Sequence, residues 1–114
     1  MPRNMSFAMT TEQYKKQTKT VTRRFGWWFL KEGDICNGVN KVMGFKKGEK
    51  MVKYGKHKII STRKEPLNAI TKEDVVREGF PDWTPAQFVN MLVEHYGVKP
   101  SDEVNRIEFE YINN

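Results

Sequence analysis

The final segment of the chain, residues 104–112, places the strongest constraint on how this sequence can fold. Its apolar side chains Ile107, Phe109 and Tyr111 fall at every second position, and charged side chains fill the positions between them. A period of two is that of a β-strand with one buried face and one solvent-exposed face. The sequence therefore predicts a sheet, with this segment as a half-buried strand whose outer face is charged.

Turn residues divide the rest of the chain into short elements in which strand and helix patterns follow no regular order. A helix is predicted from Thr10 or Thr11 to about Lys16, with Gln13 as the capping-box partner of Thr10. A second helix is predicted over residues 71–79. Extended stretches are predicted at residues 4–9, 18–25, 35–43 and 57–63.

The clearest helix signal lies at residues 84–97. Thr84 is a suitable N-cap, Pro85 occupies the first helical position, Gln87 the third, and Gly97 follows as the stop signal. A stripe at helical spacing is assigned to the core rather than to a ligand site; it consists of Phe88, Met91, Leu92 and His95.

These patterns predict a single domain over residues 1–114, with an ordered core at about residues 4–112. Strands and helices mixed without a repeating order are typical of the α+β class, here with a mainly antiparallel sheet or small barrel. The chain has 114 residues, of which 38% are hydrophobic and 12% aromatic. This is the size of one domain, with enough apolar side chains for one core.

Basic residues are concentrated in the first part of the sequence. Residues 1–64 hold 16 basic and 4 acidic side chains, a net charge of +12, whereas residues 65–114 hold 4 basic and 10 acidic ones, a net charge of −6. Residues 44–56 are rich in glycine and lysine and are predicted to form a long loop or hairpin. A positive surface attracts polyanions, so contact with a nucleic acid, RNA or DNA, is predicted. A solvated lysine coat and docking on an acidic protein are the alternatives.

Several functional classes are excluded by what the sequence lacks. It has no phosphate-binding G-x-x-x-x-G-K-[ST] loop, and its two histidines and one cysteine, His57, His95 and Cys36, are not at metal-ligand spacing. We therefore predict no metal and no cofactor. A single cysteine, no apolar run of membrane-spanning length and no export signal at the N-terminus predict a cytoplasmic protein without a membrane partner.

Residues 19–24 bring two hydroxyls and three cations into six positions. If the segment is extended, Thr20, Thr22 and Arg24 share one face, and Lys19 joins them only if it sits at a turn before the strand. A lysine ammonium beside hydroxyls suits an anion or a polarised carbonyl. A solvated basic strand is the alternative.

Three motifs in this order resemble the ASCH domain family. Residues 17–24, QTKTVTRR, are similar to its G-x-K-x-x-[TE]-x-R signature, although Gln17 stands where the family often has glycine. Residues 28–34, WFLKEGD, resemble its lysine-x-glycine-aspartate turn, and residues 77–80, REGF, its E-G-F helix end. The resemblance covers about residues 4–112 and implies a small PUA-like β-barrel flanked by two or three helices.

The resemblance also implies a cleft with a basic rim that accepts RNA, a nucleotide or a modified nucleoside. Some small bacterial members are amidohydrolases of N4-acetylcytidine, and others are reported as ribonucleases or as binding modules. Whether this chain is an enzyme is left open by the sequence, as is its oligomeric state. A small basic domain of this kind fits a phage or bacterial genome.

In the amidohydrolases a lysine, a threonine three residues later and a glutamate carry out catalysis, and these positions fall on Lys19, Thr22 and Glu78. Thr22 would attack the acyl carbonyl, Lys19 would accept its proton, and Glu78 would pass a proton to the leaving amine. Arg24 would steady the oxyanion. The structural alternative is an ion pair between Lys19 and Glu78 at the cleft mouth, with Thr22 capping a backbone group.

The remaining candidate residues are assigned to ligand or RNA binding. The lysine-rich insertion is not a feature of the smallest enzymes of the family, so it favours a larger polyanion over a nucleoside. A tryptophan or tyrosine can stack on a base, and lysines can contact phosphates. The predicted binding residues are Thr20, Arg24, Trp28, Lys46, Lys47, Lys50, Lys53, Tyr54 and Lys56.

Overall fold

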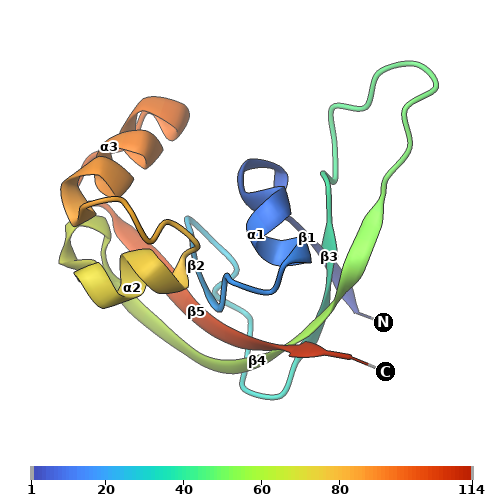
Figure 1. Ribbon diagram of the computed structural model, residues 1–114, viewed down its shortest axis with the longest axis horizontal. Coiled ribbons are helices and arrows are strands. Elements are labelled where there is room, and N and C mark those ends of the chain that lie inside the picture. The colour runs from blue at the N-terminus through green and yellow to red at the C-terminus, as the bar shows by residue number, and fades with distance from the viewer. Residues whose placement is uncertain (1, 114) are drawn as a thin grey trace.

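The computed structural model describes residues 2–113 as a curled five-stranded sheet with helices on it (Figure 1). The strands are β1 (Arg3–Ser6), β2 (Val21–Arg24), β3 (Ile35–Val39), β4 (Lys53–Pro66) and β5 (Glu103–Ile112). The α-helices are α1 (Thr11–Lys15), α2 (Lys72–Arg77) and α3 (Pro85–Tyr96), and two 3₁₀ turns, η1 (Ala8–Thr10) and η2 (Leu67–Ala69), complete the elements.

The strand order in the sheet is β1-β3-β4-β5-β2, with β1 and β2 at the edges. β1 and β3 are parallel, and the other three pairs are antiparallel. The long pair β4–β5 has a register shift between Ile59 and Ser61, and such irregularities bend a strand. The prediction of an α+β fold with a small, mainly antiparallel barrel-like sheet and flanking helices is confirmed.

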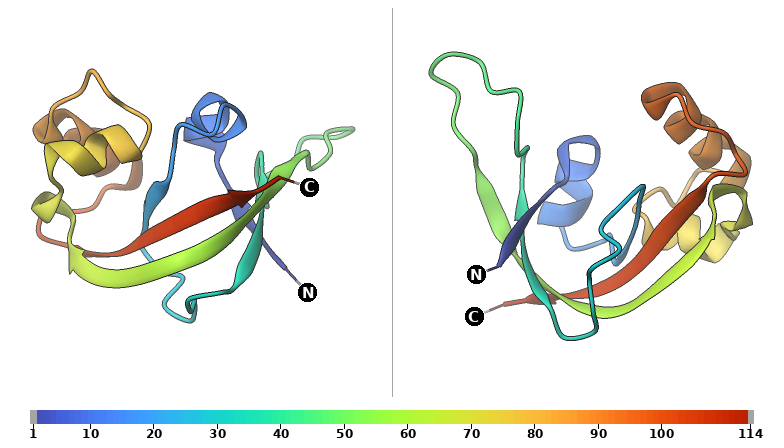
Figure 2. Two further views of the ribbon diagram at one scale, coloured as in Figure 1. Left: turned by 60° about the horizontal axis from the view of Figure 1, so that its bottom comes forward. Right: turned by 180° about the vertical axis from the view of Figure 1, so that it is seen from behind.

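Figure 2 shows α2 and α3 gathered at one end of the curled sheet and the β3–β4 hairpin projecting at the other end. The connection from β1 to β2, which contains η1 and α1, lies between them. Tyr14 of α1 is buried and packs so closely on Gly38 of β3 that a β-carbon there would lie 2.2 Å from its ring. A glycine is required at that point because any side chain would displace α1.

Apolar side chains form two clusters. The cluster beneath α1 includes Phe7, Tyr14, Ile59 and Phe109, and the cluster beneath α2 and α3 includes Leu67, Val75, Phe88, Leu92 and Val104. β5 contributes Ile107 and Phe109 to the first cluster and Val104 to the second, so this strand connects the two ends of the molecule. Within residues 2–113, no helix has the length and the apolar character needed to span a membrane.

Local signals placed most elements correctly, with some corrections. Thr84 and Gln87 form the predicted capping box of α3, but Thr10 makes no side-chain cap, so the box predicted with Gln13 is wrong. The stretch predicted over residues 4–9 is a strand only to Ser6, because η1 turns the chain toward α1. The stretch at 35–43 ends at Val39, and that at 57–63 extends over Lys53–Pro66.

Arg106 corrects the prediction for the last strand. Its side chain was expected on the solvent-exposed charged face, but only 7% of the residue is exposed. Asp74 of α2 accepts two hydrogen bonds from its guanidinium, at 2.6 and 3.0 Å. At this end of β5 the helices cover the face that the alternation assigned to solvent.

Candidate functional site

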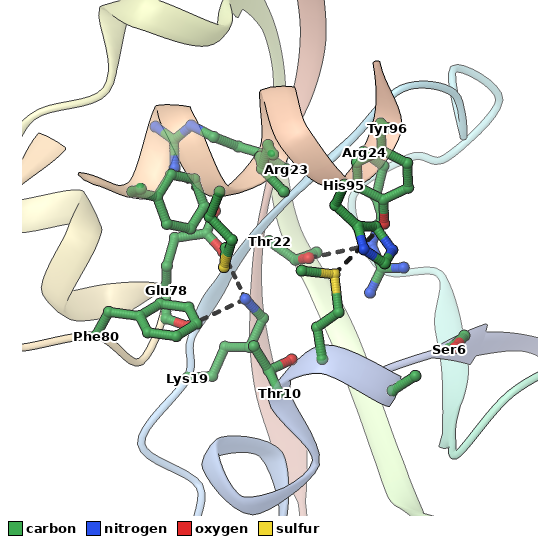
Figure 3. A pocket seen from close by; sticks show the side chains of 15 residues that line it. Ser6, Thr10, Lys19, Thr22, Arg23, Arg24, Glu78, Phe80, His95 and Tyr96 are labelled. Atoms are coloured by element: carbon green, nitrogen blue, oxygen red, sulfur yellow. Dashed lines mark hydrogen bonds and ion pairs between the residues drawn. The ribbon is translucent and has the colours of Figure 1, made fainter. Parts of the chain in front are cut away.

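A pocket of about 200 Å³ opens between η1, β2 and α3 (Figure 3). One side of it is polar and consists of Lys19, Thr22, Arg23, Arg24 and Glu78. The lining also contains apolar side chains, among them Phe80, Phe88, Met91 and Leu92. The three residues predicted as catalytic, Lys19, Thr22 and Glu78, therefore line a single cavity, although 59 positions separate the first from the last.

Lys19 and Glu78 form a buried ion pair in this pocket. The Lys19 Nζ donates to Glu78 Oε1 at 2.5 Å and to the Glu78 backbone carbonyl at 3.1 Å. The two side chains are 4% and 2% exposed. Burial lowers the pKa of Lys19, against the opposing effect of the Glu78 carboxylate. The pair predicted by the structural alternative is thus present, and it is buried in the wall of a cavity.

The backbone before β2 explains how Lys19 reaches the same cavity as Thr22. Gln17 has φ 60°, in the left-handed region that glycine favours, and this residue ends α1 with a sharp reversal of the chain. Lys19 then lies in the turn before β2, and its carbonyl accepts a hydrogen bond from the Tyr111 hydroxyl. The requirement that Lys19 sit at a turn is met. The glycine common at the Gln17 position in ASCH domains would suit the same backbone conformation.

Glu78 is held by the end of α2. Thr71 caps the start of this helix by accepting from the Asp74 amide, and the Glu78 amide donates to the Asp74 carbonyl at 2.7 Å. Gly79 follows with φ 101°, and a β-carbon on it would lie 2.5 Å from the Gln13 Cγ. The E-G-F sequence therefore combines a carboxylate that lines the pocket, a glycine that the backbone requires and Phe80 on the pocket wall.

Thr22 and Arg24 lie next to each other along the pocket. Thr22 is 3% exposed, and its Oγ1 accepts a hydrogen bond from Arg24 Nε at 3.1 Å. The Arg24 guanidinium carbon lies 4.9 Å from the centre of the Phe7 ring, and burial lowers the pKa of this arginine. No hydrogen bond joins Thr22 to Lys19 among residues 2–113, so a proton passing between them would travel through a ligand or a water molecule.

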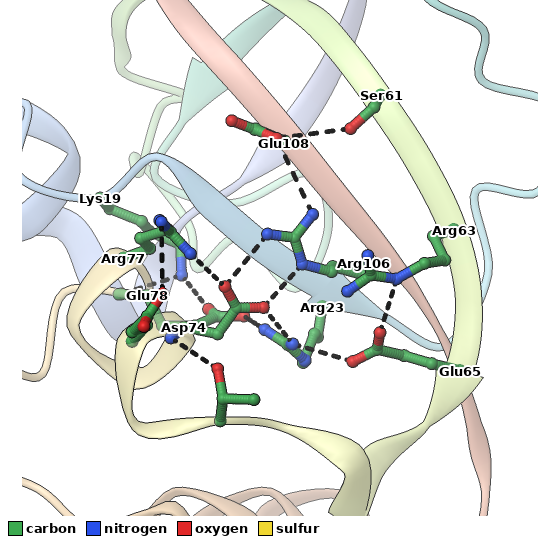
Figure 4. Close-up of polar contacts among 12 residues, drawn as sticks. Lys19, Arg23, Ser61, Arg63, Glu65, Asp74, Arg77, Glu78, Arg106 and Glu108 are labelled. Carbon is green, nitrogen blue, oxygen red and sulfur yellow. Dashed lines mark hydrogen bonds and ion pairs between the residues drawn. The ribbon is translucent and has the colours of Figure 1, made fainter.

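Behind the pocket lies a charged network that the sequence did not reveal (Figure 4). Arg23 donates to Glu78 Oε2 at 3.1 Å, to Asp74 Oδ2 at 2.5 Å and to Glu65 Oε2 at 2.9 Å. Although burial opposes ionisation, hydrogen bonds from Arg106 and Arg23 hold the pKa of Asp74 well below its usual range. The network fixes Glu78 from the side opposite Lys19.

Two predicted binding residues, Thr20 and Trp28, lie outside both the pocket and the β3–β4 hairpin. The backbone of Thr20 makes hydrogen bonds to α2 and β5. Its amide donates to the Arg77 carbonyl at 2.8 Å, and its carbonyl accepts from the Phe109 amide at 3.0 Å. Trp28 is 51% exposed, with the Lys64 Nζ 5.4 Å from the centre of its ring. The neighbouring Trp27 has φ 62°, so the chain is not extended at this point.

The other six predicted binding residues lie on the β3–β4 hairpin, which Figure 1 shows projecting away from α3. Tyr54 anchors its base, with its hydroxyl 3.3 Å from the Thr11 hydroxyl and the Lys15 Nζ 5.8 Å from the centre of its ring. The lysines are Lys46, Lys47, Lys50, Lys53 and Lys56, and none of them lines the pocket. The basic cleft predicted as one site therefore consists of a pocket and a distant lysine-rich hairpin.

The helical stripe of α3, predicted as core, has two roles. Phe88 and Leu92 are buried in the cluster beneath α2 and α3. These two residues and the other two members of the stripe, Met91 and His95, also line the pocket.

Among residues 2–113 no three His, Cys, Asp or Glu side chains gather closely enough to hold a metal ion.

Comparison with known proteins supports the fold and no finer assignment. No protein-family model matches the sequence, and no curated protein matches it. One solved structure with a similar fold is the crystal structure of protein EF3133 from Enterococcus faecalis V583, described with the family model DUF984. The TM-score is 0.68 at 14% sequence identity, over 98% of this chain and 80% of that chain. A likeness at this identity shows a shared architecture.

Proposed function

We propose that this chain is an ASCH-type domain whose pocket binds a nucleoside or a single modified nucleobase. The observation that carries the proposal is the buried Lys19–Glu78 pair in the wall of a cavity. An ammonium and a carboxylate withdrawn from water offer strong hydrogen-bonding groups to a ligand that enters. The signature residues Lys19, Thr22 and Arg24 lie together with Glu78, as a shared site in the family would require.

The shape and chemistry of the pocket support a base-sized ligand. About 200 Å³ is below the ~300–1,000 Å³ typical of sites for drug-sized ligands, so one ring system fits better than an oligonucleotide. The aromatic and aliphatic wall formed by Phe80, Phe88 and Leu92 suits the flat face of a base. The polar side chains of the same lining suit the donors and acceptors on the edge of the base.

Binding of cytidine, measured by isothermal titration calorimetry, tests the proposal. Replacing Lys19 with Met keeps the length of the side chain and removes the ammonium. Loss of a charge-assisted hydrogen bond should weaken binding by about tenfold to a hundredfold. The matched control is Lys16→Met, which removes an exposed lysine three positions earlier. Equal cytidine affinity in the wild type and a folded Lys19→Met variant would contradict the proposal, as would no binding by the wild type.

A second candidate function is hydrolysis of an acyl amide on the base, as in an N4-acylcytidine. The Thr22 Oγ1 accepts from Arg24, which leaves its own proton free to be donated within the pocket. Burial lowers the pKa of Lys19, and this makes the neutral amine, a proton acceptor, more accessible.

The reaction would proceed in two steps. Thr22 Oγ bonds to the acyl carbon while its proton passes through a water molecule to the Lys19 amine, and the C–N bond then breaks as that proton moves to the leaving amine. Water next cleaves the acyl–threonine ester, which releases the carboxylic acid and restores the hydroxyl. The Lys19–Glu78 pair holds the amine in place throughout.

Incubation with N4-acetylcytidine and chromatography of the products tests this second function. We expect equal amounts of cytidine and acetate, a loss of at least a hundredfold in rate for Thr22→Ala, and partial retention for Thr22→Ser, which keeps a nucleophilic hydroxyl. Thr62→Ala, at an exposed position on β4, is the matched control. If N4-acetylcytidine binds and is not hydrolysed, the hydrolase function is contradicted and the binding function remains.

A further inference from the structure

Arg24 differs from the other cations that line or support the pocket. Lys19, Arg23 and Arg106 each contact at least one carboxylate within 4.0 Å. Among residues 2–113, Arg24 has no carboxylate partner, and its one side-chain hydrogen bond is the donation from Nε to Thr22. Its two terminal nitrogens are therefore left without a protein acceptor in a site that is partly shielded from water.

The position of Arg24 is where two hollows meet. It lines the main pocket, and it also lines a second hollow beside it, whose walls include Phe25, Trp27 and Tyr96. In Figure 3, Lys19 and Glu78 lie at one end of the pocket, Arg24 lies with His95 and Tyr96 at the other, and Thr22 lies between the two ends. A ligand that spans this pocket meets an ion pair at one end and an uncompensated guanidinium at the other.

We propose that the ligand carries a phosphate monoester bound by Arg24, and hence that the pocket takes a nucleoside monophosphate. This inference rests on the proposed function, which supplies the nucleobase. A guanidinium is planar and can bind two phosphate oxygens at once. A cation held over the Phe7 ring and partly shielded from water attracts an anion more strongly than a fully solvated lysine does. The second hollow gives the sugar and phosphate room outside the base pocket.

Isothermal titration calorimetry with cytidine, cytidine 5′-monophosphate and inorganic phosphate tests the inference on the full chain. We expect the wild type to bind the monophosphate about 10- to 100-fold more tightly than cytidine, the gain expected of a charge-assisted bidentate contact. In Arg24→Gln this ratio should fall to about 1. The matched control is Arg3→Gln, which removes the same charge from a residue outside the pocket and should keep the ratio.

The two proposals fail in different ways. Cytidine that binds the wild type as tightly as its monophosphate overturns the phosphate inference and leaves the nucleoside pocket standing. If neither compound binds, the proposed function fails and the inference fails with it. The phosphate inference is also overturned if inorganic phosphate binds at Arg24 but does not compete with cytidine 5′-monophosphate. Should Arg24→Gln not fold, Arg24→Lys replaces it: the charge remains, the bidentate geometry is lost, and the ratio should fall several-fold.

Discussion

His57 is a titratable residue held in the core beneath α1. Its Nδ1 lies 2.9 Å from the Tyr14 hydroxyl, and its ring packs against Phe7 and Phe109. Burial lowers its pKa from 6.5 to about 4. Because the unfolded chain takes up this proton at higher pH than the folded one, the contribution to stability is complete above about pH 6.5 and declines as the pH falls toward 4.

We predict that the free energy of unfolding falls by about 2 kcal/mol between pH 7 and pH 5, since each pKa unit corresponds to ~1.4 kcal/mol. Urea denaturation at the two pH values measures the difference. His57→Gln should remove most of the decline, whatever its stability at pH 7. His95→Gln removes the other histidine and should keep the decline. A similar decline in the wild type and His57→Gln would assign the effect to other groups.

Single residues also show why the site was only partly predictable. Lys19, Thr22 and Glu78 were found through motifs, and each motif records a local backbone need, such as the left-handed residue before Lys19 and the glycine after Glu78. No motif in the sequence identifies Arg23 or Asp74 as part of the site. Their contact joins positions 51 residues apart, and no spacing rule connects side chains at that separation.

At the level of elements, the end of α2 links the fold to the site. Gly79 has φ 101°, and the space for its β-carbon is occupied by Gln13 of α1. We predict that Gly79→Ala lowers the free energy of unfolding by about 2–3 kcal/mol, through a left-handed backbone cost of ~1–2 kcal/mol and the added clash. It should also displace Glu78 and weaken cytidine binding.

Gly97→Ala is the matched comparison, measured by the same denaturation experiment. Gly97 ends α3 with φ 67°, and no atom lies within 4 Å of the place where a β-carbon would sit. Only the left-handed backbone cost should remain, about 1–2 kcal/mol, and cytidine binding should be unchanged. Equal losses for the two variants would mean that the contact between α1 and the α2 terminus contributes nothing.

The elements themselves were predictable where their signals were local. α3 carries a capping box at Thr84 and Gln87 and a glycine stop, all within one short segment. The error at Arg106 arose because a period of two identifies which side chains share a face and does not say what covers that face. α2 covers it here, and only the tertiary arrangement brings Asp74 to Arg106.

At the scale of the whole molecule, the distribution of charge separates two surfaces. The pocket contains buried, largely paired charges, whereas the β3–β4 hairpin carries solvated lysines and exposed apolar side chains, among them Met43 at 77% exposure. RNA contact by the hairpin stays a prediction from the sequence. It is compatible with a small-ligand pocket, because the two surfaces do not share residues.

The salt dependence of binding to a single-stranded oligouridylate tests the hairpin. Each phosphate contact releases counterions and adds about −0.7 to the slope of log affinity against log salt concentration. Replacing Lys46, Lys47 and Lys50 together with Gln should therefore make the slope shallower by about 2 and weaken binding at low salt. The matched control replaces Lys16, Lys31 and Lys99, three exposed lysines elsewhere, and changes the net charge equally. If the slope becomes shallower by the same amount in both triple variants, the net charge of the protein and not the hairpin attracts the RNA. If neither variant changes the slope, the lysines of both sets lie outside the interface.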